Sequence, residues 1–210
     1  MSGELYSWMQ AHLDPLDEDQ GAGRAPTPSD YDLSPQWPAP ESPPTPAAVL
    51  VALVERPPGL TVILTRRADR LRAHGGQIAL PGGRCDPGER PSETALREVE
   101  EEIGLDRRFV SLAGQSTPYR TGTGYLITPV VGFVAPGFTL TPNPDEVADI
   151  FETPFGFLMD PQNYLEHERE LPSGERRRFY AMTHEDRYIW GATAGLLRAL
   201  YERLYGAAVA

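Results

Sequence analysis

Cysteine and long apolar runs are both scarce in this chain of 210 residues. The single cysteine, Cys85, excludes an internal disulfide framework and any zinc site built from several cysteines. No run approaches the roughly 18 consecutive apolar residues that a membrane-spanning helix needs. The start, Met1-Ser2-Gly3-Glu4, lacks the basic and apolar regions of a signal peptide. We therefore expect a cytoplasmic protein that makes no contact with a membrane.

Basic runs are also absent, and the formal net charge is −11. A protein that binds duplex nucleic acid needs a basic face to displace counterions from the phosphates. An acidic protein can still bind a small anion where metal ions and a few arginines reverse the local field. The charge thus argues against nucleic-acid polymers as partners and leaves nucleotides open.

Proline is abundant, with 22 residues, and nine of them precede Ala47. We divide the chain into a proline-rich arm over residues 1–46, with a short helix over 3–13, and a globular domain over residues 47–206. Within the arm, residues 15–46 show no sustained period and are expected to be extended or partly disordered. The hydrophobic content of 40% is ample for the core of one domain.

The domain reads as strands, a helix, further strands and a closing helix. Apolar runs at 48–54 and 60–65 flank Pro57-Pro58-Gly59 and predict a hairpin. Ser92 is expected to cap a helix that runs to Ile103 and stops at Gly104. The remaining predicted elements are a short apolar piece at 78–80, strands at 110–113 and 126–134, an apolar stretch at 151–158 interrupted by Pro154, and an amphipathic helix over 188–204. This order predicts an α/β or α+β fold with a mixed sheet.

Three glutamates crowd one side of the predicted helix. Glu98 and Glu102 are one turn apart, and Glu101 lies beside them. Like charges at this spacing repel by a few tenths of a kcal/mol per pair, roughly, which a divalent cation would relieve. Oxygen ligands of this kind suit Mg²⁺ or Mn²⁺. The plainer alternative is a solvated acidic face.

The residues around these glutamates form a longer pattern, Gly-x5-Glu-x7-Arg-Glu-Val-x-Glu-Glu-x-Gly-Leu, over residues 83–105. It fills every fixed position of the Nudix box, so the chain resembles a Nudix hydrolase. The resemblance implies an α/β/α sandwich with a mixed central sheet and metal-dependent hydrolysis of a nucleoside diphosphate at its pyrophosphate. By position, Glu98 and Glu102 would be the core metal ligands, and Glu101 a further ligand or a base acting through water. Gly82 would lend its carbonyl to the metal, and an ion pair between Glu89 and Arg97 would fix the loop on the helix.

The segment before the box, residues 63–83, resembles the additional motif of coenzyme A pyrophosphatases within the Nudix group. Ile63 replaces a leucine of that motif and Leu80 replaces a phenylalanine. The segments 143–151 and 189–194 also look like parts of that subgroup, which implies 3′,5′-ADP and 4′-phosphopantetheine, or its acylated form, as products.

Four arginines in this segment could meet the 3′-phosphate of coenzyme A, because guanidinium groups suit phosphate oxygens. They are Arg66, Arg67, Arg70 and Arg72. We expect Arg66, Arg67, Arg72 and His74 to bind the substrate, although the arginines could instead pair with surface acids and His74 could serve a turn.

Glu146 falls in an expected loop and could complete the metal shell, act as general base or be an ordinary surface acid. Two other functions stay open at this point. One is hydrolysis of another nucleoside diphosphate derivative, such as ADP-ribose or a dinucleotide. The other is nucleotide sensing by a non-catalytic Nudix-fold protein, with the arm as a contact for a partner. A homodimer is a further possibility.

Overall fold

A computed structural model describes residues 3–16, 27–37, 42–71, 73–170, 174 and 176–206. Four helices and two short 3-10 turns are present in this part of the chain: α1 (Gly3–His12), α2 (Pro91–Ile103), α3 (Phe155–Leu158), α4 (Ala192–Tyr205), η1 (Arg107–Phe109) and η2 (Pro161–Asn163). Helix α1 confirms the short helix expected over 3–13. Arg72, expected to bind substrate, lies outside the described residues, as do parts of the arm.

The central sheet is mixed, as expected. Its strands are β1 (Thr45–Arg56), β2 (Gly59–Arg67), β3 (Ile78–Ala79), β4 (Gly82–Arg84), β5 (Val110–Gln115), β6 (Tyr119–Arg120), β7 (Tyr125–Val134) and β8 (Val147–Pro154). Strands β1 and β2 form the predicted hairpin, with Arg56 opposite Gly59. On its other side β1 runs parallel to β7 from Thr45 to Val54. The predicted strands at 110–113 and 126–134 are confirmed as β5 and β7.

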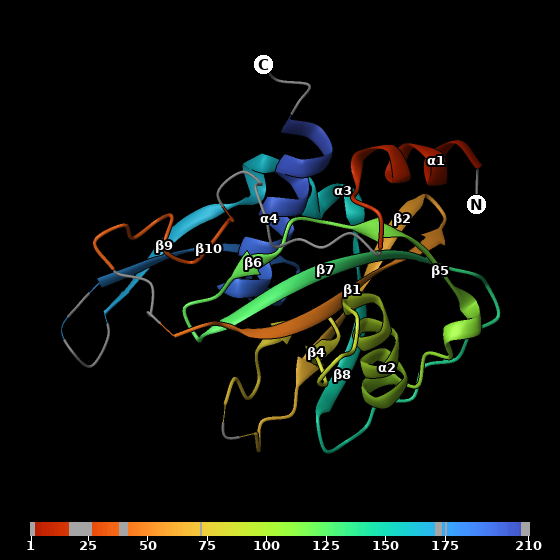
Figure 1. The fold of residues 1–210 in the computed structure, drawn as a ribbon, viewed down its shortest axis with the longest axis horizontal. Coiled ribbons are helices and arrows are strands. Elements are labelled where there is room, and N and C mark those ends of the chain that lie inside the picture. The colour runs from red at the N-terminus through yellow and green to blue at the C-terminus, as the bar shows by residue number, and fades with distance from the viewer. Residues whose placement is uncertain are drawn as a thin grey trace.

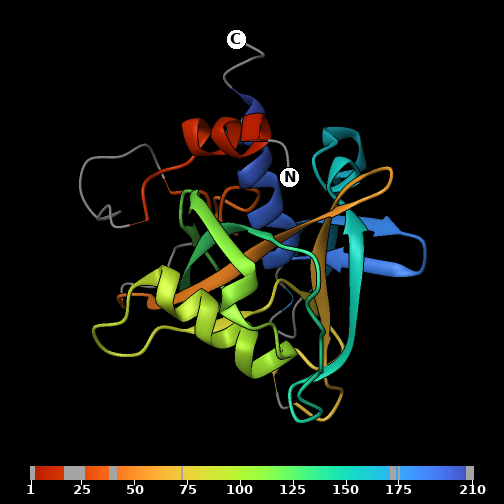
Figure 2. The ribbon, with the colours of Figure 1, turned by 90° about the vertical axis from the view of Figure 1, so that its right-hand side faces the viewer.

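Strand β1 is apolar along nearly its whole length because both faces of the sheet are covered. Val49, Val51 and Leu53 point into a core shared with α1, α3 and α4. Leu50 and Val54 point the other way, into a core shared with Val99 and its neighbours on α2. Figures 1 and 2 show α1 and α4 on one side of the sheet and α2 on the other. The α/β/α sandwich is therefore confirmed.

Helix α2 begins earlier than predicted. Pro91, not Ser92, opens it, and Arg90 occupies the cap position, where its backbone N–H donates to the Glu93 carboxylate at 2.9 Å. Ser92 as cap is thus wrong, because the fixed φ of Pro91 already suits the first helical turn. The predicted end is correct: Gly104 adopts φ 65°, a left-handed conformation that glycine takes at little cost.

A second, three-stranded sheet was not predicted. It has the order β11 (Arg187–Trp190), β10 (Arg176–His184) and β9 (Leu165–Glu170). The helix predicted over 188–204 is wrong in its first residues, because Tyr188–Trp190 pair with β10 and Gly191 breaks the chain direction with φ 61° before α4 begins. The apolar stretch at 151–158 likewise divides into β8 and α3 at Pro154.

Part of the arm packs on the domain. Met9 of α1 is fully buried in the core to which α4 also contributes. Further along, Ser29 pairs with Arg120 of β6, which ties residues 27–37 to the edge of the central sheet. Within the described part of the chain, no helix combines the length and apolarity needed to cross a bilayer.

Candidate active site

The first glutamate of the predicted site lies where α2 crosses β4. A Cβ atom on Gly83 would come within 2.5 Å of the Glu98 carboxylate, so glycine at this position leaves room for that carboxylate against β4. Glu98 is half-buried, and this burial raises the pKa of its carboxyl group.

Glu102 is the more deeply placed of the two. Its side chain is only 4% exposed, and one carboxylate oxygen accepts a hydrogen bond from the backbone N–H of Gly82 at 3.1 Å. Arg67 Nη1 lies 3.7 Å from the other oxygen. The pKa of Glu102 is raised to about 7, mainly by burial. The hydrogen bond from Gly82 and the charge of Arg67 oppose this rise, and the charges of Glu98 and Glu146 add to it. The native fold therefore holds a carboxylate where water cannot stabilise its charge.

Arg97 joins the loop and the helix as the sequence predicted. Its Nε atom donates to Glu89 at 2.9 Å, and its Nη1 atom donates to Glu98 at 2.8 Å and to Glu101 at 3.1 Å. The hydrogen bonds from Arg97 lower the pKa of Glu89 to about 2. Glu101 itself is largely exposed, with 56% of its side chain accessible. A guanidinium thus stands among the three carboxylates of the box.

Glu146 comes from the turn just before β8, as the expected loop position implied. Its charge raises the pKa of both Glu98 and Glu102, so the three carboxylates share one region. The sequence could not establish this proximity, because 44 positions separate Glu146 from Glu102 along the chain.

A divalent cation fits this set of donors. One buried and one half-buried carboxylate, both with raised pKa values, would be stabilised by a cation. Among the described residues, no three His, Cys, Asp or Glu side chains are arranged to hold an ion unaided. Mg²⁺ does not need such a cage, since it usually takes one or two carboxylates and keeps waters or substrate phosphates as its other ligands. Glu98 and Glu102 would be those two carboxylates.

The predicted substrate-binding arginines separate into two groups. Arg66 pairs with Asp69 at 2.7 Å, and Arg70 pairs with Asp145, so both engage surface acids. Arg67 instead faces the glutamates, and its Nε atom is buried without a hydrogen-bond partner among the described residues. His74 has φ 59° and its Nδ1 atom lies 2.9 Å from Gln77 Oε1. Nothing in the local sequence distinguishes Arg66 from Arg67. In the structure, the pairing of β2 with β8 shifts register between these two residues, and their side chains meet different partners.

A cleft of about 310 Å³ lies beside this site. Arg67, His74, Gly82 and Gly83 line it, and residues from β7 and α4 close its other side. Tyr125, Thr123 and Thr193 are lining residues that the sequence did not single out. The hydroxyl of Thr193 donates to the Ile78 carbonyl at 3.0 Å, which attaches α4 to β3 at the cleft wall.

The sandwich, its carboxylate-bearing helix and the glycine loop against that helix suit an enzyme of metal-assisted phosphate hydrolysis. Residues 44–176 match the NUDIX domain family. The chain is 40% identical over 161 residues to uncharacterized Nudix hydrolase NudL of Photorhabdus laumondii, covering 75% of this chain and 84% of that protein. A NudL of Yersinia pestis strain Pestoides F is also 40% identical, with 75% and 79% covered.

Among solved structures, a Nudix hydrolase from M. smegmatis, RenU, shares the fold with a TM-score of 0.53 at 21% identity, covering 80% of this chain and 89% of that one. The chain belongs to the Nudix hydrolase family. Members of this family act on small molecules that contain a pyrophosphate and generally use divalent cations such as Mg²⁺ or Mn²⁺.

Proposed function

We propose that this chain hydrolyses the pyrophosphate of coenzyme A or acyl-CoA to 3′,5′-ADP and 4′-phosphopantetheine or its acylated form. One observation carries the proposal: the segment that resembles the coenzyme A motif forms a wall of the cleft beside the glutamates. Arg67 and His74, both from that segment, line the same cavity as Gly82 and Gly83. We also propose that the protein is cytoplasmic and forms a homodimer.

In this proposal, each residue of the site has a role that follows from its position. Glu98 and Glu102 would hold Mg²⁺ or Mn²⁺, with Glu101 and the Gly82 carbonyl as further donors. When bound, the cation neutralises phosphate oxygens and lowers the pKa of a water molecule. Arg67 would bind a phosphate oxygen and His74 would orient one. Glu146 would accept a proton from the attacking water.

The substrate assignment is tested with a panel of coenzyme A, dephospho-coenzyme A, ADP-ribose and NADH in Mn²⁺, followed by product analysis. Coenzyme A should give 3′,5′-ADP and should be preferred to dephospho-coenzyme A, which lacks the 3′-phosphate. A higher kcat/KM for ADP-ribose or NADH would assign another nucleoside diphosphate derivative. Nucleotide binding without phosphate-ester products would instead support a sensor.

The glutamates are tested by Glu98→Gln and Glu102→Gln. Because each removes a charged metal ligand, kcat should fall by about a thousand-fold, which corresponds to the several kcal/mol that metal catalysis supplies. Glu100→Gln is the matched control, since Glu100 lies on the same helix but pairs with Arg107 outside the site. Near-parental rates for either site variant at saturating metal would remove that residue from the assignment.

A further inference from the structure

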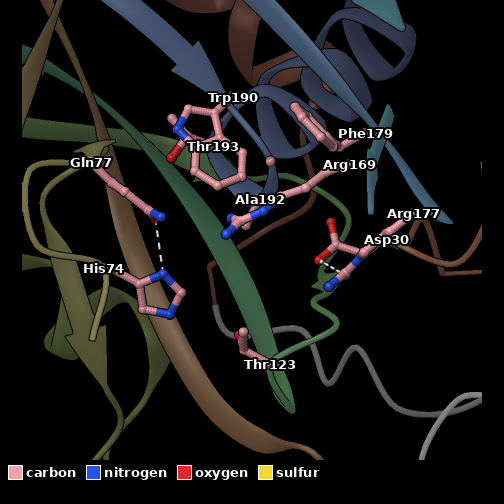
Figure 3. Close-up of a pocket in the computed structure, with 11 residues that line it drawn as sticks. Asp30, His74, Gln77, Thr123, Arg169, Arg177, Phe179, Trp190, Ala192 and Thr193 are labelled. Carbon is pink, nitrogen blue, oxygen red and sulfur yellow. Dashed lines mark hydrogen bonds and ion pairs between the residues drawn. The ribbon is translucent and has the colours of Figure 1, made fainter. Parts of the chain in front are cut away.

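A second cavity of about 240 Å³ continues from the cleft. His74, Gln77, Thr123 and Thr193 line both spaces, so the two are contiguous. The walls of the second cavity come from the three-stranded sheet and from the arm. Figure 3 shows His74 and Gln77 on one side and the Asp30–Arg177 pair on the other, with Trp190 and Phe179 above.

One face of the three-stranded sheet combines cations with aromatic rings. Arg169 of β9 lies directly opposite Arg177 of β10. Next to them on the same face, the rings of Phe179 and Trp190 lie 5.2 Å apart. Like charges directly opposite each other destabilise a strand pair. An anion bound between the two guanidinium groups would attract both of them and so offset their repulsion.

Arg177 is held in a fixed position by the arm. Its Nη2 atom lies 2.8 Å from Asp30, its guanidinium carbon lies 4.6 Å from the centre of the Trp37 ring, and a Cβ on Gly122 would come within 1.8 Å of it. Only 20% of its side chain is exposed. A guanidinium fixed in this way loses little entropy when it binds an anion.

Arg169 is different, since it is exposed and has no ion-pair partner among the described residues. The two positive charges of Arg169 and Arg177 exceed the negative charge of Asp30 by one unit. The cavity therefore offers a net positive charge next to two aromatic rings inclined at 57° to each other, in a chain whose formal net charge is −11.

We infer that this second cavity binds the nucleotide end of the substrate: a planar base lies against Trp190 and Phe179, and its ribose phosphate pairs with Arg169 and Arg177. Aromatic stacking recognises the flat base, and guanidinium groups recognise phosphate oxygens. Asp30 is a positioning residue that orients Arg177. That the base is adenine rests on the proposed function. That the ligand is a planar ring bearing a phosphate rests only on the residues of the cavity.

Titration calorimetry of the full chain with adenosine 3′,5′-bisphosphate tests this site. Arg169→Gln should weaken binding about ten-fold, since a charge-assisted hydrogen bond is lost. Arg176→Gln is the matched control, because Arg176 is the neighbouring residue on the opposite face of β10 and pairs with Glu168. Trp190→Leu should weaken binding, and Trp190→Phe should restore most of it. In turnover of coenzyme A, Arg169→Gln should raise KM by a similar factor and leave kcat unchanged.

Parental affinity in Arg169→Gln, or an equal loss in Arg176→Gln, would overturn the inference. The result also separates this inference from the proposed function. Hydrolysis of coenzyme A with no effect of Arg169→Gln would refute the second site alone. Arg169-dependent binding of the bisphosphate in a chain that does not cleave coenzyme A would refute the substrate proposal and support the site.

Discussion

Glu102 shows how a single residue can be costly for the fold and useful for the site. A carboxylate that is 4% exposed and has a pKa of about 7 is ionised at neutral pH only at a price in stability. Glutamine has nearly the same shape, and its carbonyl can still accept the hydrogen bond from Gly82. The fold keeps the charged residue, which suits a position that receives a cation.

This cost predicts a pH dependence. The folded pKa of Glu102 lies above its ordinary value of 4.5, so the penalty is absent below pH 4.5 and grows as the pH rises through about 7. In a metal chelator at pH 8, Glu102→Gln should therefore be more stable than the parent by about 1–3 kcal/mol. The difference should vanish near pH 4.5. Thermal unfolding at both pH values measures it, and a less stable variant at pH 8 would contradict it.

The residue arrangement of the box was predictable because it is local. Helical spacing alone placed Glu98 beside Glu102, and the ion pair of Glu89 with Arg97 spans only one loop. Long-range pairs gave no such signal. The ion pair of Asp30 with Arg177 joins positions 147 residues apart, and nothing in either local sequence marks it.

At the scale of elements, the contact of β4 with α2 sets the position of Glu98. Gly83→Ala would place a methyl group 2.5 Å from the Glu98 carboxylate, and this side chain must then move. We expect turnover to fall by about ten-fold or more while the fold is kept, because small displacements of a catalytic group are expensive. Gly59→Ala is the control, since a Cβ there meets nothing within 4 Å. Circular dichroism and kcat together decide the outcome; unchanged turnover would show that Glu98 does not depend on this contact.

Secondary structure was predictable where its period was strong and failed where elements were short. The apolar run at 48–54 predicts a buried strand, and β1 indeed has eight consecutive buried residues. Strand β9 is exposed along all six residues, so no apolar pattern marks it. Strand β11 has four residues, and its Tyr188 and Ile189 also fit a helical face that continues into α4. Pairing with β10 decides between the two conformations, and pairing is a tertiary effect.

At the scale of the whole molecule, a substitution in α1 tests whether the arm and the domain unfold together. Met9 is fully buried against the core, so Met9→Ala should destabilise the chain by about 2–5 kcal/mol. Because α1 contributes to the same core as β1 and α4, we expect one cooperative transition at a lower Tm. Ser7→Ala, on the exposed side of α1, is the control. An unchanged Tm for Met9→Ala would show that α1 contributes nothing to the stability of the domain.

The cleft also has a consequence for how the chain comes to function. Its walls include Asp30 near the beginning, His74 and Thr123 in the middle, and Arg177 and Trp190 near the end. Contacts between such distant positions form late, because the entropy of long loops is lost before the contacts can stabilise the chain. During synthesis, the chain must have emerged at least as far as Trp190 before these walls can meet. The cavity therefore cannot be complete until β10 and β11 have paired.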